Sequence, residues 1–185
     1  GSTGAALVQH LDIDKIAFTG STEVGKRIQQ AIAGTAKKAT LELGGKAANI
    51  ILDDAPLHQA VEGIINGIFF NQGHVCCAGS RLLVQEGVYD SVVTLLKDRM
   101  ETLRVGDPLD KNTDIGAINS KAQQDIIQGY LELGEKEGAE IHQPNCTLPS
   151  KGYWCLPTLF LNATQSHRIV QEEIFGPVLA VQTFR

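Results

Sequence analysis

The sequence has no apolar run that approaches the roughly 18 residues of a membrane span. Its N-terminus has neither the basic nor the apolar segment of a secretory signal. It also lacks any cluster of Lys and Arg, and its formal net charge is -5. These absences argue against a membrane protein and against a nucleic-acid-binding protein. We therefore expect a cytoplasmic protein that acts on small molecules and binds neither a membrane nor a nucleic acid.

Cysteine is scarce as well. The four cysteines are Cys76, Cys77, Cys146 and Cys155, and their spacing is not that of a disulfide framework. Adjacent cysteines such as Cys76 and Cys77 pair with each other only with strain. We therefore expect all four thiols to be reduced.

The remaining composition is typical of a folded domain, because 43% of the 185 residues are hydrophobic and 20% are charged. Short apolar runs alternate with longer segments in which apolar residues recur at helical spacing. Strands are predicted over residues 15–19, 39–43, 48–52, 81–85, 158–161 and 178–184, and helices over residues 22–35, 56–71, 88–103 and 119–136. This alternation predicts an α/β fold with a largely parallel sheet.

A glycine-flanked turn with two adjacent cysteines follows the helix predicted over residues 56–71. The segment reads Phe69-Phe-Asn-Gln-Gly-His-Val-Cys-Cys-Ala-Gly-Ser-Arg81. A thiol in such a turn can be presented to a cleft, and backbone N–H groups can stabilise both the thiolate and a developing oxyanion. Cys76 and Cys77 are therefore candidate nucleophiles. The alternative is that both are small core residues.

A single carboxylate lies between leucines in the segment Thr40-Leu-Glu-Leu-Gly-Gly-Lys46. Burial of Glu42 among apolar residues would suit it to act as a general base. The two glycines would let a ligand or another backbone segment come close. The alternative is a solvated carboxylate on the face of a strand.

Two further segments are candidates for binding phosphate and ribose groups. In Phe18-Thr-Gly-Ser-Thr-Glu-Val-Gly25, free N–H groups at the start of a helix could receive a phosphate, although Gly20 and Ser21 also suit an ordinary turn and helix cap. In Glu172-Glu-Ile-Phe-Gly-Pro177, a carboxylate could hold ribose hydroxyls. The alternative for this acidic pair is a solvated loop.

In their order along the chain, these four segments resemble the aldehyde dehydrogenase superfamily over essentially all 185 residues. By this resemblance Cys76, which lies five residues before Arg81, is the nucleophile, Cys77 is its non-catalytic neighbour, and Glu42 is the general base. The implied reaction oxidises a small-molecule aldehyde to a carboxylic acid with NAD or NADP, with NAD favoured. It proceeds through a thiohemiacetal and a thioester on Cys76.

The resemblance also implies a cofactor site made from two segments of the chain, and no metal. The residues are Gly20, Ser21, Val24 and Gly25 on the phosphate and adenosine side, and Glu173 and Phe175 at the nicotinamide ribose. One departure lies close to the nucleophile, where His74 occupies a position that is usually Gln in the family. A metal site built on His74, Cys76 and Cys77 is disfavoured, because their spacing falls short of the usual ligand pattern.

By the same resemblance, residues 1–44 are the C-terminal part of a truncated, Rossmann-like cofactor domain. Residues 45–185 are then a catalytic thiol domain that lacks its C-terminal end. Such a division predicts an exposed sheet edge. The resemblance also implies a homo-oligomer for a full-length parent. The alternative function is that of a truncated, non-catalytic isoform or pseudoenzyme that at most associates with full-length subunits.

Overall fold

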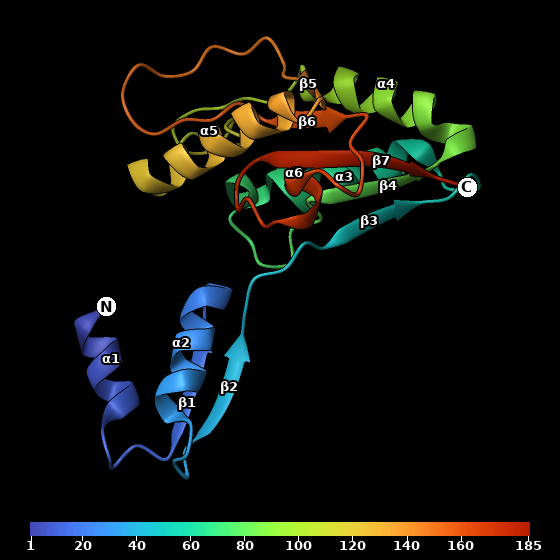
Figure 1. The fold of residues 1–185 in the computed structure, drawn as a ribbon. Coiled ribbons are helices and arrows are strands. Elements are labelled where there is room, and N and C mark those ends of the chain that lie inside the picture. Colours follow the sequence, from blue (N-terminus) through green and yellow to red (C-terminus); the bar gives the residue numbers. More distant parts are fainter. The chain divides into compact units, whose positions relative to one another are not determined.

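A computed structural model describes residues 1–185, which form two compact units, Gly1–Gly45 and Lys46–Arg185 (Figure 1). The first unit contains α1 (Ser2–Gln9), β1 (Lys15–Thr19), α2 (Thr22–Ile32) and β2 (Lys38–Glu42). The second contains β3 (Ala48–Ile51), α3 (Leu57–Phe69), η1 (Phe70–Gly73), β4 (Arg81–Gln85), η2 (Glu86–Val88), α4 (Tyr89–Met100), α5 (Lys121–Lys136), β5 (Glu140–His142), β6 (Thr158–Leu161), α6 (Arg168–Gln171) and β7 (Val178–Phe184). No helix combines the length and the apolar composition that a membrane span requires.

The first unit is a strand, helix and strand with a small core. β1 and β2 pair in parallel and only with each other, in a two-stranded sheet. The hydroxyl of Ser21 accepts a hydrogen bond from the N–H of Val24 at 3.3 Å, which starts α2 at the predicted place. The buried residues of α2 are Gly25, Ile28 and Ile32, which share one face of the helix. The division between the units lies beside the boundary predicted after residue 44, and the roles of the two parts stay predictions.

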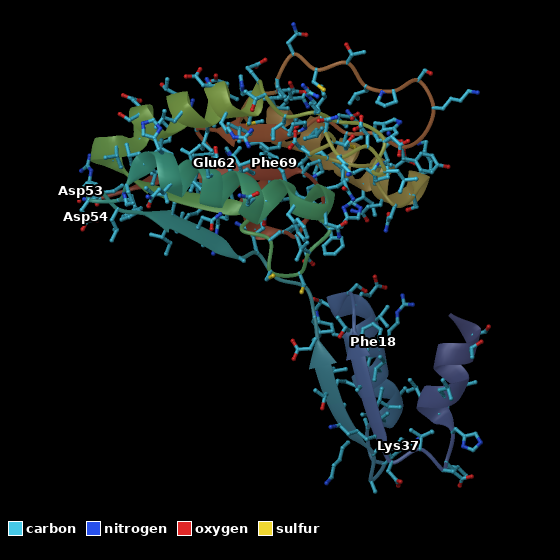
Figure 2. The ribbon with its side chains drawn as sticks, turned by 180° about the vertical axis from the view of Figure 1, so that it is seen from behind. Phe18, Lys37, Asp53, Asp54, Glu62 and Phe69 are labelled. Atoms are coloured by element: carbon cyan, nitrogen blue, oxygen red, sulfur yellow. The ribbon has the colours of Figure 1, made fainter.

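Lys37 holds the end of α1 in the first unit (Figure 2). Its ammonium group donates hydrogen bonds to the carbonyl oxygens of Val8, at 2.7 Å, and His10, at 2.6 Å. These carbonyls lie at the C-terminus of α1, where a cation satisfies acceptors that the helix itself leaves free. α1 has no buried residue, so this contact, rather than core packing, fixes its C-terminal end.

The second unit is built on a five-stranded sheet in the order β3-β4-β7-β6-β5. All pairs are parallel except β5 with β6, which is antiparallel. The α/β fold with a largely parallel sheet is therefore confirmed. β5 and α6 cannot be predicted from the sequence, because three and four residues are too few to show a period of apolar side chains.

Side-chain alternation along β6 and β7 divides the core of the second unit into two layers. Leu159 and Leu179 point to one face of the sheet, and Phe160 and Ala180 point to the other. Helices α3 and α4 cover the first face, and α5 and α6 cover the second. Figure 1 shows α3 behind β7 and α6 in front of it. Strands buried on both faces read as continuous apolar runs, as these do.

Gly134 allows α5 to lie directly against this second layer. A Cβ atom at this position would come within 2.4 Å of the ring of Phe160 and 3.2 Å of Ile169. Phe160 is fully buried and cannot move aside. We expect Gly134→Ala to lower the free energy of unfolding by about 1 to 3 kcal/mol through overpacking, measured by urea denaturation followed by the fluorescence of Trp154.

Gly129→Ala is the matched control. Gly129 lies in the same helix, and nothing would lie within 4 Å of an added Cβ. Alanine should raise the free energy of unfolding there by about 0.5 to 1 kcal/mol, because it is the better helix former. An equal gain from both substitutions would contradict the close packing of Gly134.

Candidate active site

The predicted nucleophile lies in the connection between α3 and β4. Before it, Asn71, Gln72 and Gly73 have left-handed φ angles of 49°, 58° and 72°. An added Cβ at Gly73 would come within 2.1 Å of the carbonyl oxygen of Gly176, so only glycine fits there. Gln72 is held by its side-chain oxygen, which accepts a hydrogen bond from the N–H of Gly116 at 2.9 Å.

Cys76 and Cys77 form the tip of the next turn, which is closed by a hydrogen bond of 3.0 Å from the N–H of Ala78 to the carbonyl of Val75. Both thiols are free and exposed. The alternative in which they are core residues is therefore wrong, because the turn points them away from the buried layers. Cys155 differs from them, since its burial raises the pKa of the thiol to about 11 and keeps it protonated. We call residues 75–78 the nucleophile turn.

The far end of the nucleophile turn is tied to the rest of the unit. The N–H of Gly79 donates to the carbonyl of Gly67 in α3 at 3.0 Å. The carbonyl of Gly79 accepts from the side-chain amide of Asn49 in β3 at 3.2 Å. A Cβ at Gly79 would meet this amide at 2.3 Å. The turn is thus bound both to the helix before it and to the edge strand of the sheet.

The two carboxylates of the acidic pair before β7 differ in their hydrogen bonding. Glu172 accepts hydrogen bonds from Tyr130, at 2.7 Å, and from two nitrogens of Arg168, each at 2.9 Å. These hydrogen bonds lower the pKa of Glu172, and those from Arg168 have the larger effect. None of these bonds involves Glu173. The side chain of Glu173 therefore remains available to a ligand.

Phe175 is held in an uncommon backbone conformation, with a φ of 56°. The amide of Gln123 in α5 donates to the carbonyl oxygens of Ile174, at 2.9 Å, and of Phe175, at 3.1 Å. The ring of Phe175 lies against the ring of His74, with their centroids 5.4 Å apart. The structure therefore brings the segment before Cys76 and the cofactor candidate Phe175 together. The sequence held no signal for Gln123, which lies about fifty residues from its acceptors.

Lys46 is a buried cation to which the sequence pattern assigns no role. Its ammonium nitrogen is buried and has no hydrogen-bond partner, and the same holds for Nε of Arg81. The pKa of Lys46 is lowered to about 8, first by burial and second by the charge of Arg81, and the charge of Glu173 opposes this shift. Glu173 thus has a cation beside it. The only signal in the sequence was the glycine pair directly before Lys46.

These groups gather because they precede neighbouring parallel strands. Lys46 comes before β3, Cys76 before β4, and both Glu173 and Phe175 before β7. The three strands are adjacent in the sheet, with Ala48 opposite Arg81 and Arg81 opposite Ala180. Parallel pairing places their amino ends at the same edge.

The remaining predicted residues lie in the first unit. The N–H of Gly20 donates to the carbonyl of Glu42 at 3.0 Å, which joins the turn after β1 to the end of β2. Of the two alternatives for Glu42, the structure shows the solvated carboxylate on a strand face, because strand alternation turns Leu41 and Leu43 to one side and leaves Glu42 exposed on the other. Gly25 packs against Leu43, where a Cβ would come within 2.6 Å.

The start of α2 has the groups that an anion needs. The backbone N–H groups of Thr22 and Glu23 have no partner within the chain. Val24, one of the predicted cofactor residues, is exposed in the first turn of the same helix. Free N–H groups there suit a phosphate, and the free carboxylate of Glu173 suits ribose hydroxyls. Each of these groups, within its own unit, fits one part of a dinucleotide. No three His, Cys, Asp or Glu side chains are grouped to hold a metal ion.

Comparison with known proteins decides the family. The family model described as "Aldehyde dehydrogenase family" matches residues 1–185. The chain belongs to the aldehyde dehydrogenase family. Among curated relatives, an aldehyde dehydrogenase of Emericella nidulans is 48% identical over 185 residues, which is 100% of this chain and 37% of the relative. One of Alternaria alternata is 49% identical over 183 residues, 98% of this chain and 37% of the relative.

Solved aldehyde dehydrogenases have the same fold. An NAD+ complex of the Bacillus cereus enzyme is 46% identical, with a TM-score of 0.93 over 98% of this chain and 37% of that chain. Betaine aldehyde dehydrogenase of Staphylococcus aureus, in complex with NAD+, is 38% identical, with the same TM-score and the same coverage. The family resemblance is confirmed. The chain spans 37% of the length of these relatives.

The buried Lys46 makes the stability of this aldehyde dehydrogenase chain depend on pH. Below pH 8 the folded and unfolded states both hold the proton, and burial of the charge costs free energy. Between pH 8 and the ordinary pKa of 10.5, only the unfolded state holds the proton, so the free energy of unfolding rises with pH. The free energy of unfolding of the wild type, compared with that of Lys46→Met, should rise by about 3 kcal/mol over this pH range. The measurement is urea denaturation at several pH values.

Lys111→Met serves as the control, because the side chain of Lys111 is exposed. The wild type and this variant should show the same pH dependence. A constant difference between wild type and Lys46→Met over the same range would contradict a buried, charged Lys46 in the neutral protein.

Proposed function

We propose that this aldehyde dehydrogenase oxidises an aldehyde to a carboxylic acid with NAD+, with Cys76 as nucleophile and Glu42 as general base. The observation that supports it most is the exposed Cys76 thiol at the tip of a hydrogen-bonded turn, within a unit that also carries the free carboxylate of Glu173. A nucleophilic thiol must be accessible, and Cys76 meets this condition. The buried Cys155 does not.

The first chemical step belongs to the nucleophile turn. The thiolate of Cys76 forms a C–S bond to the aldehyde carbon, and the carbonyl oxygen becomes an oxyanion. The N–H groups of Cys76 and Cys77 form no hydrogen bond within the chain, so both can donate to that oxygen. Bound NAD+ supplies the acceptor for the hydride that leaves this carbon.

The second step releases the acid from the thioester that remains on Cys76. The carboxylate of Glu42 takes a proton from water, the water oxygen attacks the thioester carbon, and the C–S bond breaks. Exposure of Glu42 in the chain is compatible with contact to water. The product is a carboxylic acid, and the thiolate is restored.

Two groups of residues would hold the cofactor. The turn that includes Gly20 and Ser21 would contact its phosphates through the start of α2, and Val24 and Gly25 would line this side. Glu173 and Phe175 would position the nicotinamide ribose. NAD+ is favoured over NADP+ because the related enzymes of Bacillus cereus and Staphylococcus aureus were solved with NAD+.

Ester hydrolysis tests the thiol and the base without the cofactor. We expect the purified chain to hydrolyse an activated acyl ester, and Cys76→Ala to abolish this activity. Glu42→Gln should slow release of the acyl group by about 100-fold or more, because a positioned general base typically contributes this much. The measurement is the rate of product release, followed from the burst through the steady state.

Cys77→Ala is the matched control, since this neighbouring thiol is equally exposed and free. It should retain the activity. If wild type and Cys76→Ala do not differ, in samples shown to be folded by the fluorescence of Trp154, the enzymatic proposal fails. That result would favour the non-catalytic isoform.

A further inference from the structure

His74 lies two residues before Cys76 and contacts the segment that precedes β7. Its ring and that of Phe175 are tilted by 47°, with centroids 5.4 Å apart. This separation is within the range of favourable aromatic pairs. The contact is the only aromatic ring pair found in the chain, and it joins the approach to the nucleophile with the candidate cofactor segment.

The ring of His74 has a fixed orientation. Its Nδ1 atom lies 3.2 Å from the carbonyl oxygen of Gln72. A carbonyl oxygen can only accept, so Nδ1 is the donor in this bond. The backbone N–H of His74 donates to the carbonyl of Asn71 at 2.9 Å. The ring is therefore held from its own loop on one side and by Phe175 on the other.

Hydrogen bonds alone do not explain why the ring of His74 lies in this buried position. Nε2 of His74 is buried and has no partner, and a buried polar atom without a partner costs free energy. Packing against Phe175 is the favourable contact that the ring makes in return.

The backbones of the two loops also meet here. Gly73 and Gly176 lie so close that an added Cβ at Gly73 would be 2.1 Å from the carbonyl oxygen of Gly176. A displacement of one loop must therefore move the other, because packed backbones leave no free space between them. His74 adds a side-chain contact between the two loops, two residues before Cys76.

We propose that His74 is a positioning residue whose contact with Phe175 transmits the position of that loop to the nucleophile turn and so sets the reactivity of Cys76. The inference rests on the proposed function, in which Cys76 is the nucleophile. It assigns no contact between His74 and the reacting atoms. The consequence is that a side-chain change at Phe175, which leaves the backbone contact of Gly73 and Gly176 in place, alters the Cys76 thiol only while the ring of His74 is present.

A double-mutant cycle tests this coupling. The variants are His74→Gln, Phe175→Leu and the combination, each made in a Cys77→Ala background so that one thiol of the turn remains. The measured quantity is the rate at which iodoacetamide alkylates Cys76, followed by mass spectrometry of the peptide. We expect each single substitution to change this rate by about 3-fold to 10-fold, and the double variant to match either single one.

Rates that multiply independently in the double variant would overturn the proposal, as would unchanged rates in both single variants. His74→Phe is the conservative replacement, because it keeps a ring against Phe175. It should keep the rate within about 2-fold of the wild type, and loss of the coupling in this variant would also count against the role of the ring contact.

His142→Gln is the matched control. His142 is likewise a histidine whose Nε2 is buried without a partner, but it lies in β5 at the opposite edge of the sheet from β3. This substitution should leave the alkylation rate unchanged. Ester hydrolysis measured on the same samples separates the two proposals, since loss of coupling with retained, Cys76-dependent hydrolysis would overturn only the role of His74.

Discussion

Parallel pairing of β3, β4 and β7 is the constraint on which the candidate site depends. Because the strands run in one direction, the segments that lead into them meet at one edge of the sheet. Lys46, the nucleophile turn and the Glu173 loop are far apart in sequence and adjacent for this reason alone. The two core layers, one on each face, hold the strands in register through side-chain alternation. Any loss of this register would separate Gly73 and His74, just before the nucleophile turn, from Gly176 and Phe175.

Much of the fold could be predicted from the sequence, because the spacing of apolar residues indicates the helices and strands, and glycine-containing turns indicate where they end. The strands at residues 15–19, 81–85, 158–161 and 178–184 were predicted with their observed bounds. The helix predicted to residue 71 ends instead at Phe69, two residues before the left-handed Asn71. The short β5 and α6 depend on tertiary contacts and left no local pattern.

The candidate site was predictable in its residue types but less so in its environment. The turn around Cys76 could be recognised, whereas its exposure could not be distinguished from burial by sequence. For Glu42, two flanking leucines suggested burial, although alternation along a strand places neighbours on opposite sides. The different partners of Glu172 and Glu173 were invisible as well, since Arg168 and Tyr130 reach only the first of them.

The position of β7 in the sheet also determines how its amide hydrogens exchange with solvent. Its first five residues are buried, and it pairs with β4 on one side and β6 on the other. Its amide hydrogens should therefore exchange with solvent only through the largest opening of the second unit, whereas β1 and β2, without fully buried residues, exchange through local fluctuations. The loop with Glu173 and Phe175 thus leads directly into a strand whose first five residues are protected from solvent.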